Sequence, residues 1–297
     1  MNQKIGMLGL GIMGSAMSKN LLDAGFKVVG YDVVPHKVGE FQAFGGQAAA
    51  SASEVAQTCG IVVSVLPTME SVLDSAEELA REGRPGLTLI ECSTMPLETK
   101  EAARQVMESG NMKILDCPLS GTGAQAANKD LSVYASGDRT VYEHCVPVFL
   151  GFARSHYLVG DFGAGTKMKF VANLLVAIHN VSAAEAFVLG MKAGLDPEMI
   201  LKVVGDGAGS SRMFEVRGPL MVADEYHPAT MKVDIWQKDM KIIGAFAREL
   251  QCPTPLFAAA AQLYTSAMAT GLAKKDTASV CSVLEKMAGH TRPKKDP

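Results

Sequence analysis

Residues 5–14 of this chain read Ile-Gly-Met-Leu-Gly-Leu-Gly-Ile-Met-Gly, and residues 27–32 read Lys-Val-Val-Gly-Tyr-Asp. Between these two segments lies a stretch with the apolar spacing of a helix, from about residue 12 to residue 24. The order is strand, glycine turn, helix, strand and acidic residue, which is the layout of a dinucleotide-binding βαβ unit. The beginning of the chain therefore predicts a Rossmann-type α/β domain.

Each glycine of the turn has its own task in such a unit. Gly9 permits the tight turn, Gly11 lets the backbone approach a pyrophosphate, and Gly14 lets the helix pack closely on the strand. The pyrophosphate would rest on the first turn of the helix, at Ile12 and Met13, where free N–H groups and the helix dipole favour an anion. These five residues are predicted cofactor contacts.

Asp32 ends the second predicted strand, where a carboxylate can accept both hydroxyls of an adenosine ribose. A 2′-phosphate at that place would meet a negative charge. The sequence therefore predicts NAD as the cofactor, with NADP less favoured. An acid after a strand is also a common turn former, and the neighbouring His36 and Lys37 leave tolerance of a phosphate open.

Length and composition indicate a globular protein of two domains. The 297 residues are 48% hydrophobic and 20% charged, with a net charge of −3, so the chain can bury a large core. This balance favours neither nucleic acid nor an anionic membrane as a partner. The one basic cluster, at residues 290–295, is interpreted as a solvated end.

Several features favour a cytoplasmic protein. The six cysteines show no Cys-x-x-Cys spacing, and several lie in apolar segments, as expected of reduced core thiols. The chain starts directly with a core strand, which leaves no room for a signal peptide. The most apolar stretch, residues 170–190, carries polar side chains and indicates a buried helix rather than a membrane span. No spacing typical of metal ligands is found, so no metal is expected.

The secondary-structure pattern changes near residue 165. Before it, short apolar runs alternate with helical stretches, which predicts a parallel, doubly wound sheet; after it, only helical patterns remain. The predicted strands are 5–8, 27–31, 61–66, 87–91, 113–115, 132–135 and 156–158. The predicted domains are a dinucleotide-binding domain (1–163), a long helix (164–193), an all-helical domain (194–288) and a flexible tail (289–297).

Polar and glycine-rich segments follow several predicted strands, at the edge where open α/β sheets bind ligands. Residues 66–68 and 91–94 are either cofactor contacts or ordinary loops. Residues 116–123 end in Ser120, Gly121, Thr122 and Gly123, whose hydroxyl and N–H groups could hold a carboxylate. From these residues alone, a plain connection is the favoured interpretation.

Lys169 and Asn173 are four residues apart on the long predicted helix and therefore lie on one face. Apolar residues share that face, which would bury Lys169 in part and move its pKa toward neutrality, as suits proton transfer. The alternative is a lysine whose stem is covered and whose charge reaches solvent.

Together these segments resemble the β-hydroxyacid dehydrogenase family, which includes the 3-hydroxyisobutyrate dehydrogenase and tartronate semialdehyde reductase types. The family is related to 6-phosphogluconate dehydrogenase. Residues 9–21 are similar to the family's N-terminal signature, and the likeness covers nearly the whole chain. Residues 211–217, 233–236 and 263–267 most resemble the L-threonate dehydrogenase-like branch.

The resemblance implies roles for individual residues. It makes Lys169 the catalytic lysine and Asn173 a substrate contact, and it makes the turn Ser120–Gly123 the holder of the substrate carboxylate. Further implied cofactor contacts are Leu66, Pro67, Thr94 and Lys238.

This sequence departs from the family at Thr122, where a second glycine is usual, and at residues 128–130. Arg212 stands where an aromatic residue is common, so an added guanidinium near the substrate would favour a more polar acid.

The implied function is NAD-dependent oxidation or reduction of a small 3-hydroxy acid, with Lys169 as general acid/base. Three alternatives remain at this point: a tartronate semialdehyde reductase, an imine-type reductase, and a nucleotide-binding relative without catalysis. The presence of Lys169 argues against the last two. The resemblance also implies a homo-oligomer, either a dimer or a tetramer.

Overall fold

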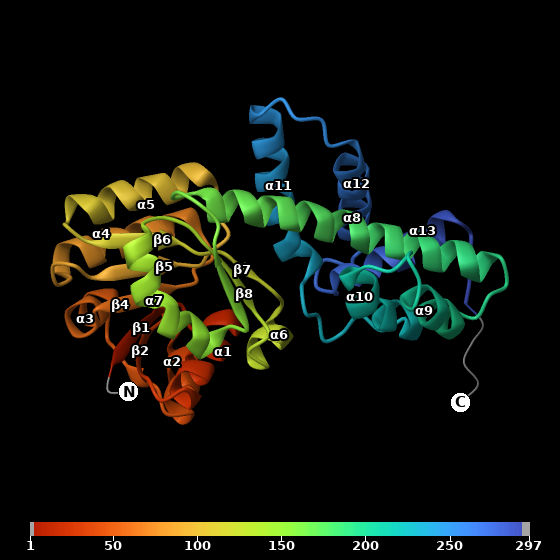
Figure 1. Ribbon diagram of the computed structural model, residues 1–297. Coiled ribbons are helices and arrows are strands. Elements are labelled where there is room, and N and C mark those ends of the chain that lie inside the picture. The colour runs from red at the N-terminus through yellow and green to blue at the C-terminus, as the bar shows by residue number, and fades with distance from the viewer. Residues whose placement is uncertain (1–2, 293–297) are drawn as a thin grey trace. The chain divides into compact units, whose positions relative to one another are not determined.

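The computed structural model describes residues 3–292, and the chain divides into two compact units, one up to Phe170 and one from Val171 onward. The first unit contains all the strands in the described residues, and the second is helical (Figure 1).

The six-stranded sheet of the first unit is parallel throughout, with the strand order β3-β2-β1-β4-β5-β6. The order reverses between β1 and β4, and ligands of open α/β sheets bind at such a reversal. This sheet, followed by the helical unit, confirms the predicted fold class. The strands are β1 (Lys4–Leu8), β2 (Lys27–Tyr31), β3 (Gln47–Ala48), β4 (Ile61–Ser64), β5 (Thr88–Glu91) and β6 (Lys113–Asp116).

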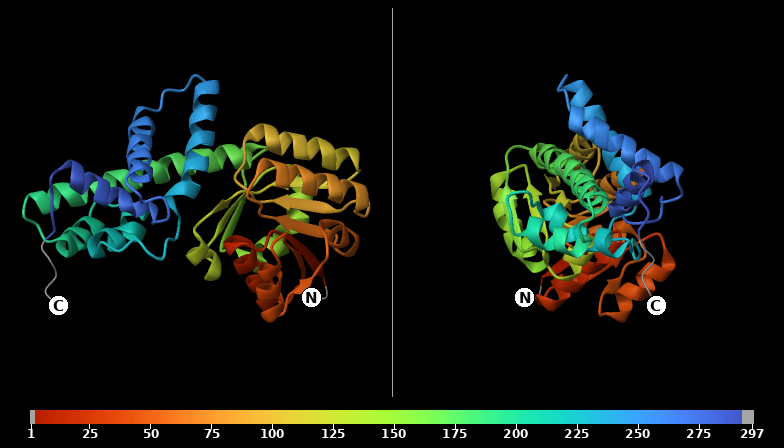
Figure 2. Two further views of the ribbon diagram at one scale, coloured as in Figure 1. Left: turned by 180° about the vertical axis from the view of Figure 1, so that it is seen from behind. Right: turned by 90° about the vertical axis from the view of Figure 1, so that its right-hand side faces the viewer.

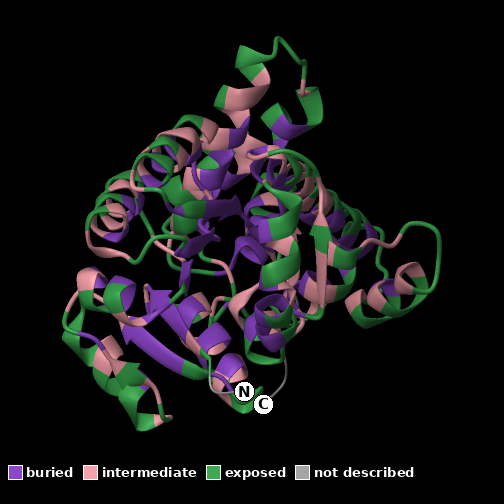
Figure 3. Ribbon diagram, turned by 60° about the vertical axis from the view of Figure 1, so that its left-hand side comes forward, coloured by how far each residue is buried: buried purple, intermediate pink, exposed green. Residues whose placement is uncertain are grey.

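Both faces of this sheet are covered by helices (Figure 2). Successive strand residues enter two different apolar clusters: Val28 and Val63 belong to one, and Val29 and Val62 to the other. Burial on both faces explains why the strands are apolar without interruption, and they appear as buried in Figure 3. The first cluster includes residues of α1 (Ile12–Asp23), α2 (Pro35–Ala43), α6 (Gly123–Ala127) and α7 (Arg139–Phe152), and the second residues of α3 (Ala52–Thr58), α4 (Met69–Glu82) and α5 (Leu97–Ser109).

A second, three-stranded sheet contains β7 (Leu119–Ser120), β8 (Ser132–Ala135) and β9 (Ser155–Leu158). The prediction that residues 132–135 and 156–158 continue the main parallel sheet is therefore wrong in this detail. β7 pairs antiparallel with β8, because only a short helix connects them and a parallel pair needs a longer crossover. Strand β7 itself was not predicted.

The second unit consists of helices, as predicted for this part of the chain. Asp196 accepts a hydrogen bond from the N–H of Met199 at 3.2 Å and so caps the start of α9. The helices are α8 (Ala164–Lys192), which crosses the division between the units, α9 (Pro197–Gly205), α10 (Arg212–Ala223), α11 (Val233–Glu249), α12 (Pro255–Ala269), the 3₁₀ turn η1 (Thr277–Ser279) and α13 (Val280–Met287).

Helix α8 is long and apolar enough to cross a membrane by length and composition, and half of its most apolar stretch is buried in the protein. Its buried Asn180 donates to the Tyr264 hydroxyl at 2.9 Å and to the Thr277 carbonyl at 3.0 Å. A helix that hydrogen-bonds its own unit in this way is typical of a protein core.

The predicted tail falls partly on described residues. Arg292 donates to the Glu285 carboxylate at 2.6 Å and to the carbonyl oxygens of Met221 and Val222 at 2.7 and 3.0 Å. Residues 293–297 of the predicted tail 289–297 lie outside the described residues, and the tail stays a prediction. The predicted domain boundaries stay a prediction.

Candidate active site

The glycine turn follows β1 with a geometry that requires two of its three glycines. Gly9 has a φ of +87°, and a Cβ added there would lie 2.3 Å from the Val65 carbonyl oxygen. A Cβ on Gly14 would lie 1.9 Å from the Gly9 carbonyl oxygen, so α1 packs directly on the turn.

Gly11 differs from the other two, because a Cβ added there would meet no protein atom within 4 Å. It is the N-cap of α1 and has no side chain with which to cap the first amides of that helix. The turn thus presents open space in front of uncapped N–H groups, which fits an approaching pyrophosphate.

Asp32 lies beside this turn at the end of β2. Its Oδ2 accepts the N–H of Leu10 at 2.7 Å, and its Oδ1 accepts the N–H of Val34 at 2.8 Å. The carboxylate is therefore held in place by the backbone, and each oxygen retains capacity for a second donor. The neighbouring Lys37 pairs with Glu40 at 3.4 Å.

The ends of β4 and β5 complete this edge of the sheet. A Cβ on Gly9 would lie 3.2 Å from Leu66 Cδ2, so Leu66 borders the glycine turn. The N–H of Leu66 donates to Ser93 Oγ at 2.8 Å, which links it to the segment that contains Thr94. Two of the predicted cofactor segments are thus joined beside the turn.

The Ser120–Gly123 turn also borders the glycine turn. A Cβ added to Gly123 would lie 2.4 Å from Ile12 Cγ2, and Asn20 of α1 donates to the Ala126 carbonyl of α6 at 2.7 Å. Gly121 has a φ of +138°, in the region that favours glycine. The two turns, more than 100 residues apart in sequence, therefore lie side by side in the first unit.

Thr122 forms the N-cap of α6. Its N–H donates to Gln125 Oε1 at 3.0 Å, and its hydroxyl accepts the N–H of Gln125 at 3.4 Å, which makes a capping box. The Gln125 amide then donates to Asp130 at 3.1 Å, and Asp130 accepts Arg154 at 2.6 Å. This network gives the departures at Thr122 and Asp130 a structural reason.

Helix α8 begins against the ends of β6 and β8. The N–H of Gly165 donates to Ser136 Oγ at 2.9 Å, and the N–H of Thr166 donates to Asp116 Oδ2 at 2.7 Å. One turn later Lys169 is buried at 9% exposure, whereas Lys167 is exposed. The burial of Lys169 agrees with the apolar helix face on which the sequence analysis places it.

Three predicted site residues belong to the second unit. Asn173 is buried, and its Nδ2 donates to Asp239 Oδ2 at 3.0 Å. Arg212 forms an exposed ion pair with Glu215 at 3.1 Å, and Lys238 lies on α11. The buried Asp239 was not predicted; its position next to Lys238 is the only signal that the sequence offers.

The first unit also contains a buried ion cluster, defined by Glu91, Lys100 and Asp116, that sequence reasoning missed. All three residues have 0% exposure, and Lys100 Nζ contacts the Glu91 carboxylate and lies 3.1 Å from Asp116 Oδ1. Burial acts to lower the pKa of Lys100, but the two carboxylates beside it outweigh burial and raise the pKa above its ordinary value. Lys100 therefore stays protonated.

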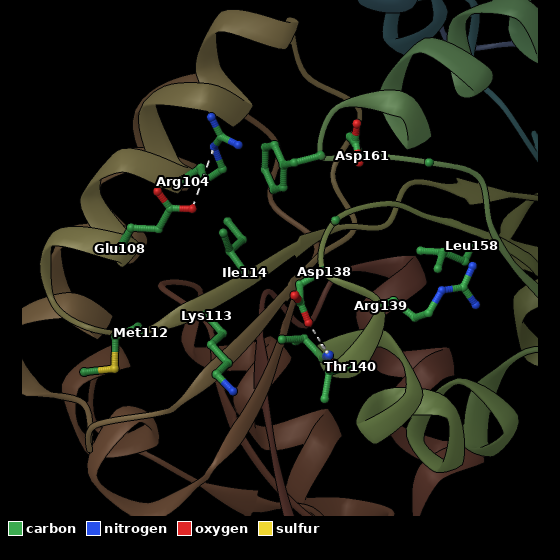
Figure 4. A pocket seen from close by; sticks show the side chains of 14 residues that line it. Arg104, Glu108, Met112, Lys113, Ile114, Asp138, Arg139, Thr140, Leu158 and Asp161 are labelled. Atoms are coloured by element: carbon green, nitrogen blue, oxygen red, sulfur yellow. Dashed lines mark hydrogen bonds and ion pairs between the residues drawn. The ribbon is translucent and has the colours of Figure 1, made fainter.

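A cavity with a volume of about 1110 Å³ lies elsewhere in the first unit. Arg104 and Glu108 of α5 lie on one side of it, and Asp138 and Arg139 at the start of α7 lie on the other (Figure 4). Its lining, drawn from described residues between 104 and 162, includes no predicted cofactor or substrate residue. Since acidic and basic side chains balance along it, we do not assign it to the candidate site.

Among residues 3–292, no three His, Cys, Asp or Glu side chains gather to hold a metal ion.

Two family models match the chain. Residues 4–160 match the NAD binding domain of 6-phosphogluconate dehydrogenase, and residues 163–284 match the NAD-binding domain of NADP-dependent 3-hydroxyisobutyrate dehydrogenase. The two matched ranges together include all residues of the candidate site.

Several known proteins are similar along their whole length. An L-threonate dehydrogenase from Cupriavidus necator is 34% identical over 95% of this chain and 96% of its own. A 2-hydroxy-3-oxopropionate reductase from Escherichia coli is 31% identical over 97% of this chain and 99% of its own. A crystal structure of 3-hydroxyisobutyrate dehydrogenase from Salmonella typhimurium superposes with a TM-score of 0.86, with 31% identity over 95% of this chain and 100% of that chain.

Proposed function

The chain belongs to the β-hydroxyacid dehydrogenase family of NAD(P)-dependent oxidoreductases, and we propose that it oxidises a small 3-hydroxy acid of the threonate type with Lys169 as general acid/base. The observation that carries this proposal is the placement of a buried lysine one turn into α8. The start of that helix is fastened to the strand end that leads into the Ser120 turn, and this turn lies against the glycine turn.

The cofactor site fits a dinucleotide. Gly11 leaves open space, the first amides of α1 suit the pyrophosphate, and Asp32 offers both carboxylate oxygens to a ribose. We propose NAD over NADP, because a 2′-phosphate would meet the Asp32 carboxylate, while Lys37, five residues later in the sequence, is already paired with Glu40. When bound, the nicotinamide supplies the hydride acceptor in oxidation and the hydride donor in reduction.

The chain's own residues position the substrate and move its proton. The Ser120 hydroxyl and the N–H groups of the turn hold the substrate carboxylate. The N–H of Thr122 does not take part, because Gln125 already accepts it.

Asn173, four residues after Lys169, orients the substrate hydroxyl, and Lys169 Nζ takes the proton of that hydroxyl as the carbonyl forms. In reduction Lys169 returns that proton. Arg212 and Lys238 stay proposed contacts to the substrate and the cofactor.

A second candidate function is reduction of tartronate semialdehyde, favoured by the similarity to the Escherichia coli 2-hydroxy-3-oxopropionate reductase. Both functions use the same lysine: it takes a proton in the oxidation and gives one in the reduction.

We further propose a homo-oligomer, as the resemblance implies, and a cytoplasmic location, since all six cysteines are free thiols.

The test is a panel of hydroxy acids and their oxo acids, with NAD and NADP side by side and NADH absorbance as the signal. We expect turnover with threonate or a close relative, and faster turnover with NAD.

Lys169→Ala should lower kcat by about 10²–10⁴-fold while NADH still binds. Lys169→Arg, which keeps a charge that cannot be released near neutral pH, should be nearly as inactive. Unchanged turnover in Lys169→Ala would refute the assignment, and NADH binding without turnover of any acid would support a non-catalytic relative.

A further inference from the structure

Two of the first amides of α8 donate to residues distant in sequence. The N–H of Gly165 bonds Ser136 Oγ at 2.9 Å, and the N–H of Thr166 bonds Asp116 Oδ2 at 2.7 Å. The Thr166 hydroxyl also donates to Asp116 Oδ1 at 2.8 Å. A carboxylate at this place satisfies helix amides and interacts favourably with the helix dipole, so Asp116 acts as a cap that comes from the sheet.

Asp116 accepts more bonds than a neutral side chain of its size could. Besides two bonds from Thr166, it accepts the Ser136 hydroxyl at 3.2 Å and lies 3.1 Å from Lys100 Nζ. An asparagine has one oxygen and would point its NH₂ group at donors. The ionised form of Asp116 is therefore what holds the start of α8.

The rest of the ion cluster extends to the cofactor side. Strands β5 and β6 pair in register, so Glu91 and Asp116 are neighbours with Lys100 between their carboxylates. Glu91 Oε1 accepts the N–H of Ser93 at 3.0 Å, and Ser93 Oγ accepts the N–H of Leu66 at 2.8 Å. One buried cation thus connects the segment beside the glycine turn with the helix that carries Lys169.

The position of Lys169 depends on this anchor. Lys169 follows Thr166 by three residues, about 4.5 Å along the helix axis at 1.5 Å per residue. Asp116 also precedes Cys117 and Pro118, which lead into the Ser120 turn, and the Pro118 carbonyl accepts the N–H of Tyr134 at 3.0 Å. A single strand end therefore holds both the substrate turn and the lysine helix.

We propose that Asp116, paired with Lys100, is a positioning residue that fixes Lys169 with respect to the Ser120 turn. Burying three charges in a cluster costs desolvation energy and is weak evidence of stabilisation. The same cluster gives a fixed geometry, and a displacement of about 1 Å in a reacting group can cost on the order of 10²-fold in rate. This inference rests on the proposed role of Lys169.

The experiment compares four variants in the full chain. Asp116→Asn removes the charge, Thr166→Val removes one hydroxyl bond and keeps the backbone bond, and Thr166→Ser keeps both. Asp138→Asn is the matched control, because Asp138 caps α7 through the N–H of Val141 at 2.9 Å, on a helix without a proposed catalytic residue. For each variant, kcat, KM, the Kd for NADH and amide hydrogen exchange of residues 165–168 are measured.

We expect Asp116→Asn to lower kcat by about 10- to 100-fold, with KM and the Kd for NADH within about twofold. Thr166→Val should lower kcat less, and Thr166→Ser and Asp138→Asn should stay near the parent protein. Exchange at residues 165–168 should speed up only where kcat falls. A kcat loss matched by loss of NADH binding, or an equal loss in Asp138→Asn, would overturn the proposal, because both indicate a general structural effect.

Two further outcomes keep this inference separate from the proposed function. If Lys169→Ala keeps full turnover, the proposed function fails, and faster exchange in Asp116→Asn then supports only the anchoring of α8. If Asp116→Asn does not fold, Thr166→Val decides, and unchanged kcat and exchange in that variant overturn the proposal.

Discussion

Gly11 and Gly14 belong to the same turn, but the packing of the fold requires a glycine only at Gly14. Gly11 has ordinary dihedral angles, φ −69° and ψ −167°, and a Cβ there would meet no protein atom within 4 Å. Gly11→Ala should therefore fold with unchanged or slightly raised stability. Its methyl group would stand in the space offered to the pyrophosphate, so we expect the Kd for NADH to rise at least about tenfold, or 1.4 kcal/mol. Fluorescence titration and thermal unfolding measure the two effects.

Gly14→Ala is the matched contrast. Its Cβ would lie 1.9 Å from a backbone oxygen that cannot move freely, so the helix has to shift, at a cost of about 1–3 kcal/mol in stability. Tight NADH binding by Gly11→Ala would show that the open space at this glycine is not the cofactor site.

Among the helices and strands, those with a clear burial pattern and sufficient length could be predicted from the sequence. Strand β4 is buried on both faces, and its apolar run was predictable. Strand β7 has two residues and depends on its pairing with β8, to which the chain returns through the short helix α6, and no local pattern reveals this pairing. Lys100 resembles any surface lysine of a helix in sequence. Its burial depends on the register that places Glu91 beside Asp116.

The residues of the candidate site also fall into two groups, those that could be predicted from the sequence and those that could not. The glycine turn and Asp32 were predictable, because each position follows from a local motif of fixed spacing. The cap that Asp116 provides to α8 joins residues 50 positions apart, and the bond from Asn173 to Asp239 joins residues 66 apart. Such bonds depend on the tertiary fold, so the sequence alone could not indicate them.

Asp276 connects three elements of the second unit. Its carboxylate pairs with Arg217 of α10, accepts the N–H of Ala278 at 3.0 Å in η1, and accepts the N–H of Thr230 at 2.8 Å in the loop before α11. Burial acts to raise the pKa of Asp276, but Arg217 and the N–H donors outweigh it and hold the pKa below its ordinary value. Because the folded pKa is depressed, this stabilisation is present above the unfolded pKa of about 3.9 and is lost as the pH falls through the folded value.

Asp276→Asn should therefore lower the free energy of unfolding by about 3–5 kcal/mol at neutral pH, since it leaves Arg217 buried without its charge partner. Urea denaturation from neutral to acidic pH should show a smaller acid-induced loss of stability than in the parent protein. Asp206→Asn, a change at an exposed carboxylate, serves as the control and should alter neither value. A neutral-pH stability equal to that of the parent protein would contradict the assigned role.

At the scale of the whole molecule, the two units together bury five of the six free thiols and expose one, Cys252. The thiolate is the reactive form of cysteine, so a thiol is inert when it is covered and its pKa is raised. Burial raises the pKa of Cys145 in the first unit and of Cys281 in the second to about 12 in each case. The fully buried Cys92 and Cys117, at the ends of β5 and β6, are shifted in the same direction by burial.

A disulfide reagent should therefore modify one thiol per folded chain at neutral pH and all six in denaturant. Cys252→Ser should abolish the reaction of the folded chain, and dehydrogenase turnover should be the same before and after modification. A second thiol that reacts as fast as Cys252 would mean that one of the two cores opens on the time scale of the assay. Repeating the assay with NADH then identifies the core that opens. If NADH slows the reaction of the second thiol, that thiol lies in the unit that binds the cofactor, because a ligand that binds only the folded state suppresses opening by mass action.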